Sequence, residues 1–135
     1  MSGCRVCGFS LRLPVARLAA SDVGLYDDAR FPGRMLVSAH EHFEHLDEMV
    51  PDDLGLFMAD VAQTSRALRS PDGVERVNVA ILGNRESHVH AHVIPRRAGE
   101  PNAGRAPWDG SEPWAPLSPT LLIALTKKFR ELLTI

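Results

Sequence analysis

Three histidines alternate with apolar residues in the stretch His88–Ile94 (His-Val-His-Ala-His-Val-Ile). Alternate residues of a β-strand point to the same face, so this pattern predicts a strand with His88, His90 and His92 on one side. At about 3.3 Å of rise per residue, the first and third histidines start about 13 Å apart. Because a zinc–nitrogen bond is only about 2.0–2.1 Å long, we do not expect the three imidazoles to share one ion. The strand therefore predicts at least two different tasks for its histidines.

The residues on either side of this strand predict an α+β fold. Residues 76–82 are expected to form another strand, which the short connection 83–87 joins to 88–94 as an antiparallel hairpin. Apolar residues at helical spacing predict helices over 51–69 and 118–134. This order of strands, helix, hairpin and helix predicts an antiparallel sheet with two main helices.

The length of 135 residues is typical of one domain, so we expect residues 1–135 to form a single domain. Between the hairpin and the last helix, residues 98–117 are rich in proline and glycine, which predicts a long loop. This loop also contains Trp108 and Trp114. Closing over a base and sealing a dimer edge are equally good interpretations of these two side chains.

The charge balance argues against a surface for nucleic acid or for an anionic membrane. The chain has 15 Lys+Arg against 17 Asp+Glu, a net charge of −2, which still permits a nucleotide pocket. It also lacks an apolar run near the roughly 18 residues that a membrane-spanning helix needs, or a convincing signal-peptide core. We therefore expect a cytoplasmic protein, in which Cys4 and Cys7 form a metal half-site or a redox pair before they form a structural disulfide.

The stretch His88–Arg96 (His-Val-His-Ala-His-Val-Ile-Pro-Arg) resembles the signature of the histidine-triad family of nucleotide hydrolases and transferases. The preceding Val77–Asn84 is similar to the branch often labelled diadenosine-tetraphosphate-hydrolase-like. The resemblance implies that His90 attacks the α-phosphorus of a nucleoside phosphate ester, anhydride or phosphoramidate. The covalent nucleotidyl-histidine would then be hydrolysed to a nucleoside monophosphate.

The third histidine favours hydrolysis over nucleotide transfer. By resemblance, His92 would bind phosphate oxygens or help the leaving group depart, and relatives that transfer nucleotides onto a sugar phosphate often carry glutamine there. The alternatives are a nucleotidyltransferase, a nucleotide-binding or regulatory protein with little turnover, and a metal enzyme with His-x-His ligands. The predicted helices oppose an all-β cupin, and 135 residues are too few for an amidohydrolase barrel.

The resemblance also implies a structural zinc ion. Many relatives bind zinc through an N-terminal Cys-x-x-Cys pair, a histidine after the third strand and the first histidine of the triad. Matched by position, these ligands are Cys4, Cys7, His42 and His88. A Cys₂His₂ site is closed and tetrahedral, so it would stabilise the fold and would not catalyse. Replacement of His42 by His40 or His45, or reduced thiols without a metal, are the alternatives.

Relatives also indicate where the nucleotide would bind. They place a ribose-binding acid after an apolar residue in the first long strand, where Asp27 matches, with Asp28 as the near alternative. Polar groups before the triad contact phosphate in relatives, which suggests Asn84 and Ser87, and Arg96 could bind distal phosphates or remain solvated. Family members are commonly homodimers, so a homodimer with a nucleotide substrate is expected.

Overall fold

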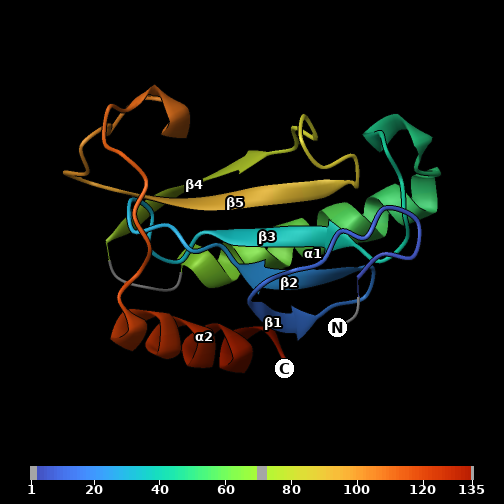
Figure 1. Cartoon of the computed structure of the whole chain (residues 1–135), viewed down its shortest axis with the longest axis horizontal. Coiled ribbons are helices and arrows are strands. Elements are labelled where there is room, and N and C mark those ends of the chain that lie inside the picture. The colour runs from blue at the N-terminus through green and yellow to red at the C-terminus, as the bar shows by residue number, and fades with distance from the viewer. Residues whose placement is uncertain (1–2, 70–72, 135) are drawn as a thin grey trace.

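The computed structural model describes residues 3–69 and 73–134 and contains a five-stranded antiparallel sheet and two α-helices (Figure 1). The strands are β1 (Pro14–Arg17), β2 (Ser21–Leu25), β3 (Met35–Ala39), β4 (Val74–Ala80) and β5 (His90–Arg97). Their order in the sheet is β1-β2-β3-β5-β4. The helices are α1 (Pro51–Arg69) and α2 (Pro119–Leu133), with 3-10 turns η1 at Leu46–Glu48 and η2 at Pro107–Asp109. The predicted antiparallel sheet with two helices is thus confirmed.

Both helices begin where local chemistry favours a start. Proline is the first residue of α1, and Asp52 and Asp53 follow in its first turn, where acidic side chains favour the helix dipole. At α2, the Ser118 hydroxyl accepts a hydrogen bond from the backbone N–H of Leu121 at 3.2 Å, as a helix cap does.

Within the described residues, no helix is long and apolar enough to cross a membrane.

The strand bounds differ from the expectations: β4 lies two residues earlier than the predicted 76–82, and β5 extends to Arg97 rather than to residue 94. β5 begins at His90, two residues later than predicted, because Val89 bonds outside the regular ladder: its N–H donates to the carbonyl of Phe43, and its carbonyl accepts from the N–H of Ala39. The strand β1 was not expected at all, because Arg12 and Arg17 interrupt its apolar pattern. Only Val15 and Ala16 of this four-residue edge strand are buried.

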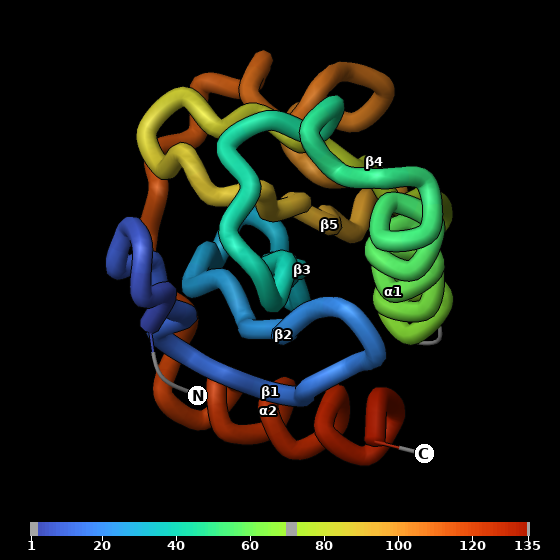
Figure 2. Tube along the Cα trace, turned by 90° about the vertical axis from the view of Figure 1, so that its right-hand side faces the viewer, coloured from blue at the N-terminus to red at the C-terminus, as the bar shows by residue number. Residues whose placement is uncertain are grey.

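The two faces of the sheet have different partners. One face is apolar and fully buried, through Val23, Val37, Ala91 and Val93, and α1 covers it with Phe57. On the opposite face, away from α1, lie the N-terminal segment in blue, the β4–β5 connection in yellow and the orange chain leading to α2 (Figure 2). The alternation of β5 buries Ala91 and Val93 under α1 and turns its histidines to this second face.

Candidate functional site

His90 is held on the second face of the sheet by a main-chain hydrogen bond. Its Nδ1 lies 2.7 Å from the carbonyl oxygen of His88. Because a carbonyl only accepts, Nδ1 carries the proton and the lone pair lies on Nε2. The ring of Phe9 stacks against the imidazole at 5.2 Å between centroids, with 20° between the planes. A neutral imidazole with a fixed ring and an available Nε2 can act as a nucleophile.

His92 is the next side chain along this face and is bound through its own Nδ1. Nη2 of Arg34 lies 2.8 Å from that nitrogen. A guanidinium group can only donate, so Nδ1 of His92 accepts and its proton lies on Nε2. The rings of His90 and His92 meet edge to face at 5.3 Å between centroids. Burial, followed by the charges of Arg34 and His90, lowers the pKa of His92 to about 4.

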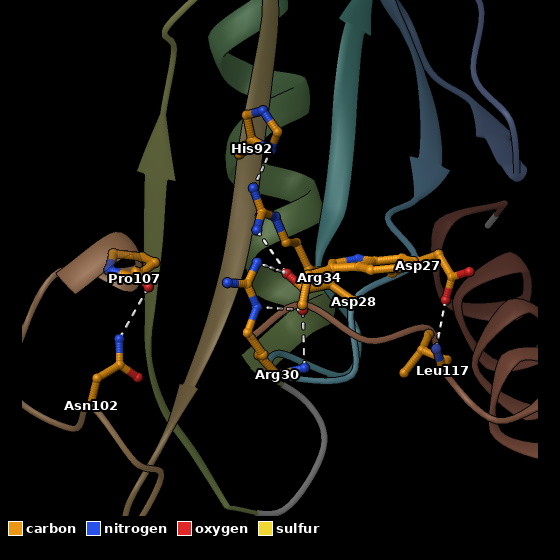
Figure 3. Close-up of polar contacts among 9 residues, drawn as sticks. Asp27, Asp28, Arg30, Arg34, His92, Asn102, Pro107 and Leu117 are labelled. Atoms are coloured by element: carbon orange, nitrogen blue, oxygen red, sulfur yellow. Dashed lines mark hydrogen bonds and ion pairs between the residues drawn. The ribbon is translucent and has the colours of Figure 1, made fainter. Parts of the chain in front are cut away.

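A buried carboxylate fixes Arg34. Asp28 is fully buried, and its Oδ2 accepts from Nη1 of Arg34 at 3.0 Å (Figure 3). Arg30 binds the same carboxylate through Nε and Nη2, each at 3.0 Å. Burial raises the pKa of Asp28, but the hydrogen bonds to Arg30 and the charges of both arginines lower it more, so the carboxyl titrates below its usual range.

A tight turn delivers Arg34 to this position. The N–H of Arg34 donates to the carbonyl of Phe31 at 3.0 Å, which closes a turn with Pro32 and Gly33 at its centre. Gly33 has φ of 100°, which glycine adopts without strain, and proline before it suits the first central position of such a turn. Arg34 therefore lies directly before β3, two residues before Leu36, and Leu36 lies opposite His92 in the sheet.

Around the two histidines lies a cavity of about 920 Å³, large enough for a nucleotide. Its walls come from the N-terminal segment, the end of β2, the β4–β5 connection and the chain before α2. Side chains from these four segments that line it include Phe9, Tyr26, Asn84 and Trp114.

Asp27 and Trp114 meet at the edge of this cavity. Asp27 lines the cavity, and its Oδ1 accepts from the backbone N–H of Leu117 at 2.7 Å (Figure 3). The indole N–H of Trp114 donates to the carbonyl of Asp27, also at 2.7 Å. Trp108 instead lies beside β4, in a different cavity. The two tryptophans therefore have different surroundings, and only Trp114 lies at the histidine cavity.

Three residues expected at the phosphates occupy different places. Asn84 lines the histidine cavity, whereas Ser87 is exposed and lies outside its lining. Arg96 also lies outside its lining: Nε donates to Glu100 at 2.6 Å and Nη1 to Asn78 at 2.6 Å. The arginines that do line the cavity are Arg12 and Arg85.

Four candidate metal ligands come together beside the start of β5. They are Cys4, Cys7, His42 and His88, and their ligand atoms all lie within 4.8 Å of one another. Sγ of Cys4 is 3.7 Å from Nδ1 of His42, and Sγ of Cys7 is 3.6 Å from Nδ1 of His88. Zinc bonds of about 2.3 Å to sulfur and 2.0–2.1 Å to nitrogen give a tetrahedral S–N edge of about 3.6 Å. The donor set and its spacing fit a zinc ion.

Protonation also favours metal binding at this cluster. Nε2 of His88 lies 2.7 Å from the carbonyl oxygen of Ala39, so it carries the proton and leaves Nδ1 free toward the cysteines. Backbone hydrogen bonds from Cys7 and Val6 lower the pKa of Cys4 to about 6, which favours the thiolate that binds metals.

The two remaining histidines lie apart from the metal cluster. Nε2 of His40 is 3.4 Å from Oδ1 of Asp22. His45 precedes the turn η1, and its backbone N–H donates to Glu48. Of the three histidines in this part of the chain, the structure therefore brings His42 to the cysteines.

Sequence reasoning missed Phe9 and Arg34 as members of the histidine site, and it considered Asp28 only as a ribose ligand, whereas Asp28 binds Arg34. Phe9 stacks on His88 at 5.3 Å as well as on His90, and so lies between the metal cluster and the cavity. A lone phenylalanine after a Cys-x-x-Cys pair carries no recognisable signal. Arg34 could have been found only from the strand register, which puts it diagonally across from His92.

The sequence and the structure of this chain are both similar to those of known proteins. Residues 21–99 match the sequence model of the HIT domain. An uncharacterised HIT-like protein of Methanocaldococcus jannaschii is 37% identical over 75 residues, which are 53% of this chain and 58% of the relative. The chain thus spans less than two thirds of that relative's length.

Solved structures share the fold. A histidine triad protein from Sinorhizobium meliloti has a TM-score of 0.79 at 24% identity, over 88% of this chain and 87% of that one. A zinc-bound histidine triad family protein from Mycobacterium smegmatis has a TM-score of 0.67 at 20% identity, over 97% and 93% of the two chains.

Proposed function

Because the chain belongs to the HIT domain family, we propose that it is a nucleotidyl-phosphate hydrolase that works through a covalent nucleotidyl-histidine. One observation carries the proposal: the rings of His90 and His92 lie 5.3 Å apart in a nucleotide-sized cavity, and the Nδ1 bonds described above leave a lone pair on Nε2 of His90 and a proton on Nε2 of His92. A nucleophile beside a hydrogen-bond donor is what substitution at a phosphate needs.

The first step forms a bond between Nε2 of His90 and the α-phosphorus of a nucleoside phosphate ester, anhydride or phosphoramidate. The bond from phosphorus to the leaving group breaks, and the leaving group departs with that electron pair. Positive charge then develops on the imidazole, and the carbonyl of His88 stabilises it by accepting the Nδ1–H. His92 donates its Nε2–H in a hydrogen bond to a phosphate oxygen. In a second displacement, the oxygen of a water molecule bonds to phosphorus and the P–N bond to His90 breaks. The electron pair returns to Nε2, a water proton passes to solvent, and the nucleoside monophosphate is released.

For the nucleotide itself, Asp27 is our candidate ligand of the ribose hydroxyls. Only one of its carboxylate oxygens, Oδ1, is bonded to Leu117, whereas arginines bind both oxygens of Asp28. Asn84 is our candidate for a phosphate contact, since it lines the same cavity. Among substrates we favour a dinucleoside polyphosphate, in keeping with the diadenosine-tetraphosphate-hydrolase-like stretch Val77–Asn84.

A zinc ion held by Cys4, Cys7, His42 and His88 completes the proposal. When bound, it would cross-link the N-terminal segment to the start of β5 without joining the chemistry. The described cysteines are free, which suits the reducing cytoplasm where we place the protein. We further propose that residues 1–135 act as one domain and that two copies form a homodimer.

The test is a quenched reaction with diadenosine tetraphosphate. We expect an adenylyl adduct on His90 by mass spectrometry, and a loss of turnover of about 10³-fold or more in His90→Ala. His45→Ala, which removes a histidine outside the cavity, is the matched control and should keep the wild-type rate. Undiminished turnover in His90→Ala would refute the mechanism, and binding without an adduct would indicate a nucleotide-binding protein instead.

A further inference from the structure

We propose, on the basis of the function above, that Arg34 is a positioning residue that keeps His92 a neutral hydrogen-bond donor, so that the site favours phosphoanhydrides over phosphoramidates. Arg34 lies outside the triad signature.

Arg34 is held from three sides. Its Nη1 donates to the buried Asp28 at 3.0 Å, and the ring of Tyr26 lies 4.1 Å from the guanidinium carbon. On the third side, its Nη2 donates to Nδ1 of His92 at 2.8 Å. The side chain of Arg34 is only 13% exposed, so water competes little with these contacts. The arrangement directs a fixed positive charge at one nitrogen of His92.

This contact fixes both the tautomer and the charge of His92. A proton on Nδ1 would face the guanidinium N–H, so Nδ1 stays an acceptor and Nε2–H points elsewhere. Burial and the charge of Arg34 together bring the pKa of His92 to about 4, so the imidazole is neutral at physiological pH.

Other groups near His92 do not offset the effect of burial and of Arg34 on its pKa. Its partners across the sheet, Leu36 on β3 and Ala80 on β4, carry no charge. The titratable neighbours within ring contact are His90 and Tyr26. The cavity beyond is lined by two acids and two arginines, namely Asp27, Glu86, Arg12 and Arg85. Arg34 is therefore the charged group bonded directly to the imidazole.

A neutral His92 limits which leaving groups can depart. In a phosphoanhydride, the P–O bond breaks and its electron pair stays on a phosphate oxygen, which is stable as an anion and needs no proton. In a phosphoramidate, the P–N bond breaks and the nitrogen must gain a proton to leave as an amine. Neutral His92 could supply that proton only by becoming an imidazolate. It can therefore stabilise phosphate oxygens but is a poor acid for P–N cleavage.

The tautomer is tested directly by ¹⁵N NMR of the full-length chain, with His92→Asn used to identify the signal. We expect Nε2 of His92 to be protonated at pH 7, Nδ1 to be unprotonated, and the ring to titrate below pH 5. In Arg34→Met the pKa of His92 should rise. Arg30→Met is the matched control, because Arg30 also binds Asp28 without touching His92, and it should leave the His92 signal unchanged.

The consequence for substrate choice is tested by comparing diadenosine tetraphosphate with adenosine 5′-phosphoramidate. Wild-type protein should prefer the anhydride in kcat/KM. If loss of Arg34 raises the pKa of His92 by one unit, the protonated fraction at pH 6 rises about ninefold. The ratio of phosphoramidate to anhydride cleavage should rise about as much in Arg34→Met, and the double variant Asp28→Asn/Arg34→Met repeats the test without a carboxylate left short of a partner.

Failure of the role proposed for Arg34 and failure of the proposed function would give different results. A proton on Nδ1 of wild-type His92, an unchanged His92 pKa in Arg34→Met, or equal cleavage of both substrates by the wild type would each overturn the inference while leaving a hydrolase. Absence of any adduct on His90 would overturn the proposed function, and the NMR result would still decide the role of Arg34.

Discussion

At the scale of single residues, His88 links the two candidate sites. Its Nδ1 points toward the cysteines, and its main-chain carbonyl accepts the Nδ1–H of His90. Any shift of His88 would thus change the orientation of His90 as well as the metal cluster. The family signature spaces these histidines two residues apart, which places a carbonyl within reach of the next imidazole on the same face.

Asp28 should make the stability of the protein depend on pH. Its pKa is lower in the folded chain than the ordinary value of 3.8, so the unfolded chain binds protons first as the pH falls. The stabilising contribution is therefore complete above about pH 5 and is lost as the pH drops through the folded pKa. We expect Tm to fall between pH 5 and pH 3 more steeply in the wild type than in Asp28→Asn, as measured by circular dichroism.

Equal slopes in the two proteins would show that Asp28 does not contribute to acid unfolding. Glu75→Gln is a suitable control, because Glu75 is an exposed acid on β4 with no salt bridge among those found in the described residues. Its Tm should follow the wild-type curve.

Side chains that lie together because of their spacing along one strand were predicted better than side chains that meet only in the folded sheet. Alternation on one strand was enough to group His90 with His92. The metal cluster was suggested by the resemblance to relatives with an N-terminal Cys-x-x-Cys pair, and the structure brings its four residues together. Arg34 reaches His92 only because β3 pairs with β5, and Ser87 misses the cavity because the β4–β5 connection turns it outward. Register and loop path depend on the whole sheet, and no short stretch of sequence determines them.

At the scale of elements, the bounds of long periodic segments were predictable and those of short segments were not. The nineteen residues of α1 have the predicted bounds, since a helix of this length repeats its apolar pattern several times. β1 has four residues and β5 starts late, because pairing partners rather than periodicity set these limits. The N-terminal segment has no regular structure of its own from residue 8 to 11, yet it carries Phe9 over two histidines.

Metal binding should therefore stabilise this segment as well as the fold. With zinc at 100 times its Kd, the folded state gains about 2.7 kcal/mol, which corresponds to a Tm increase of about 10 °C for a chain of this size. Adding a strong chelator should lower Tm by about this amount in the wild type. Cys4→Ser should start from the lower Tm and show little further change, as measured by differential scanning calorimetry with metal analysis.

A wild-type protein that retains its Tm after complete metal removal would contradict a structural role for zinc. Ser10→Ala provides the control, because it changes the same segment without removing a candidate ligand. It should keep the full response to the chelator.

At the scale of the whole molecule, the two edges of the sheet differ. β1 forms one edge, where α2 packs along it and Arg130 donates to the carbonyl of Pro14 (Figure 2). β4 forms the other edge, and in the part of the chain that the structure describes it pairs with β5 alone, so its outer main-chain groups are available for pairing with another chain. Exposed apolar side chains lie on β4 and on the neighbouring α1: Val79 is 44% exposed, Leu56 50% and Met58 40%.

The proposed homodimer should therefore form through β4. A carboxylate at Val79 would be buried without a partner when two β4 edges meet, at a cost that a modest interface could not offset. We expect the wild type to sediment as a dimer in analytical ultracentrifugation and Val79→Asp to sediment as a monomer at micromolar concentration. Ile123→Asp makes the same change at a residue of α2 that is 69% exposed, and this variant should remain dimeric. A monomeric wild type would exclude the dimer, and dissociation by Ile123→Asp alone would move the interface from β4 to α2.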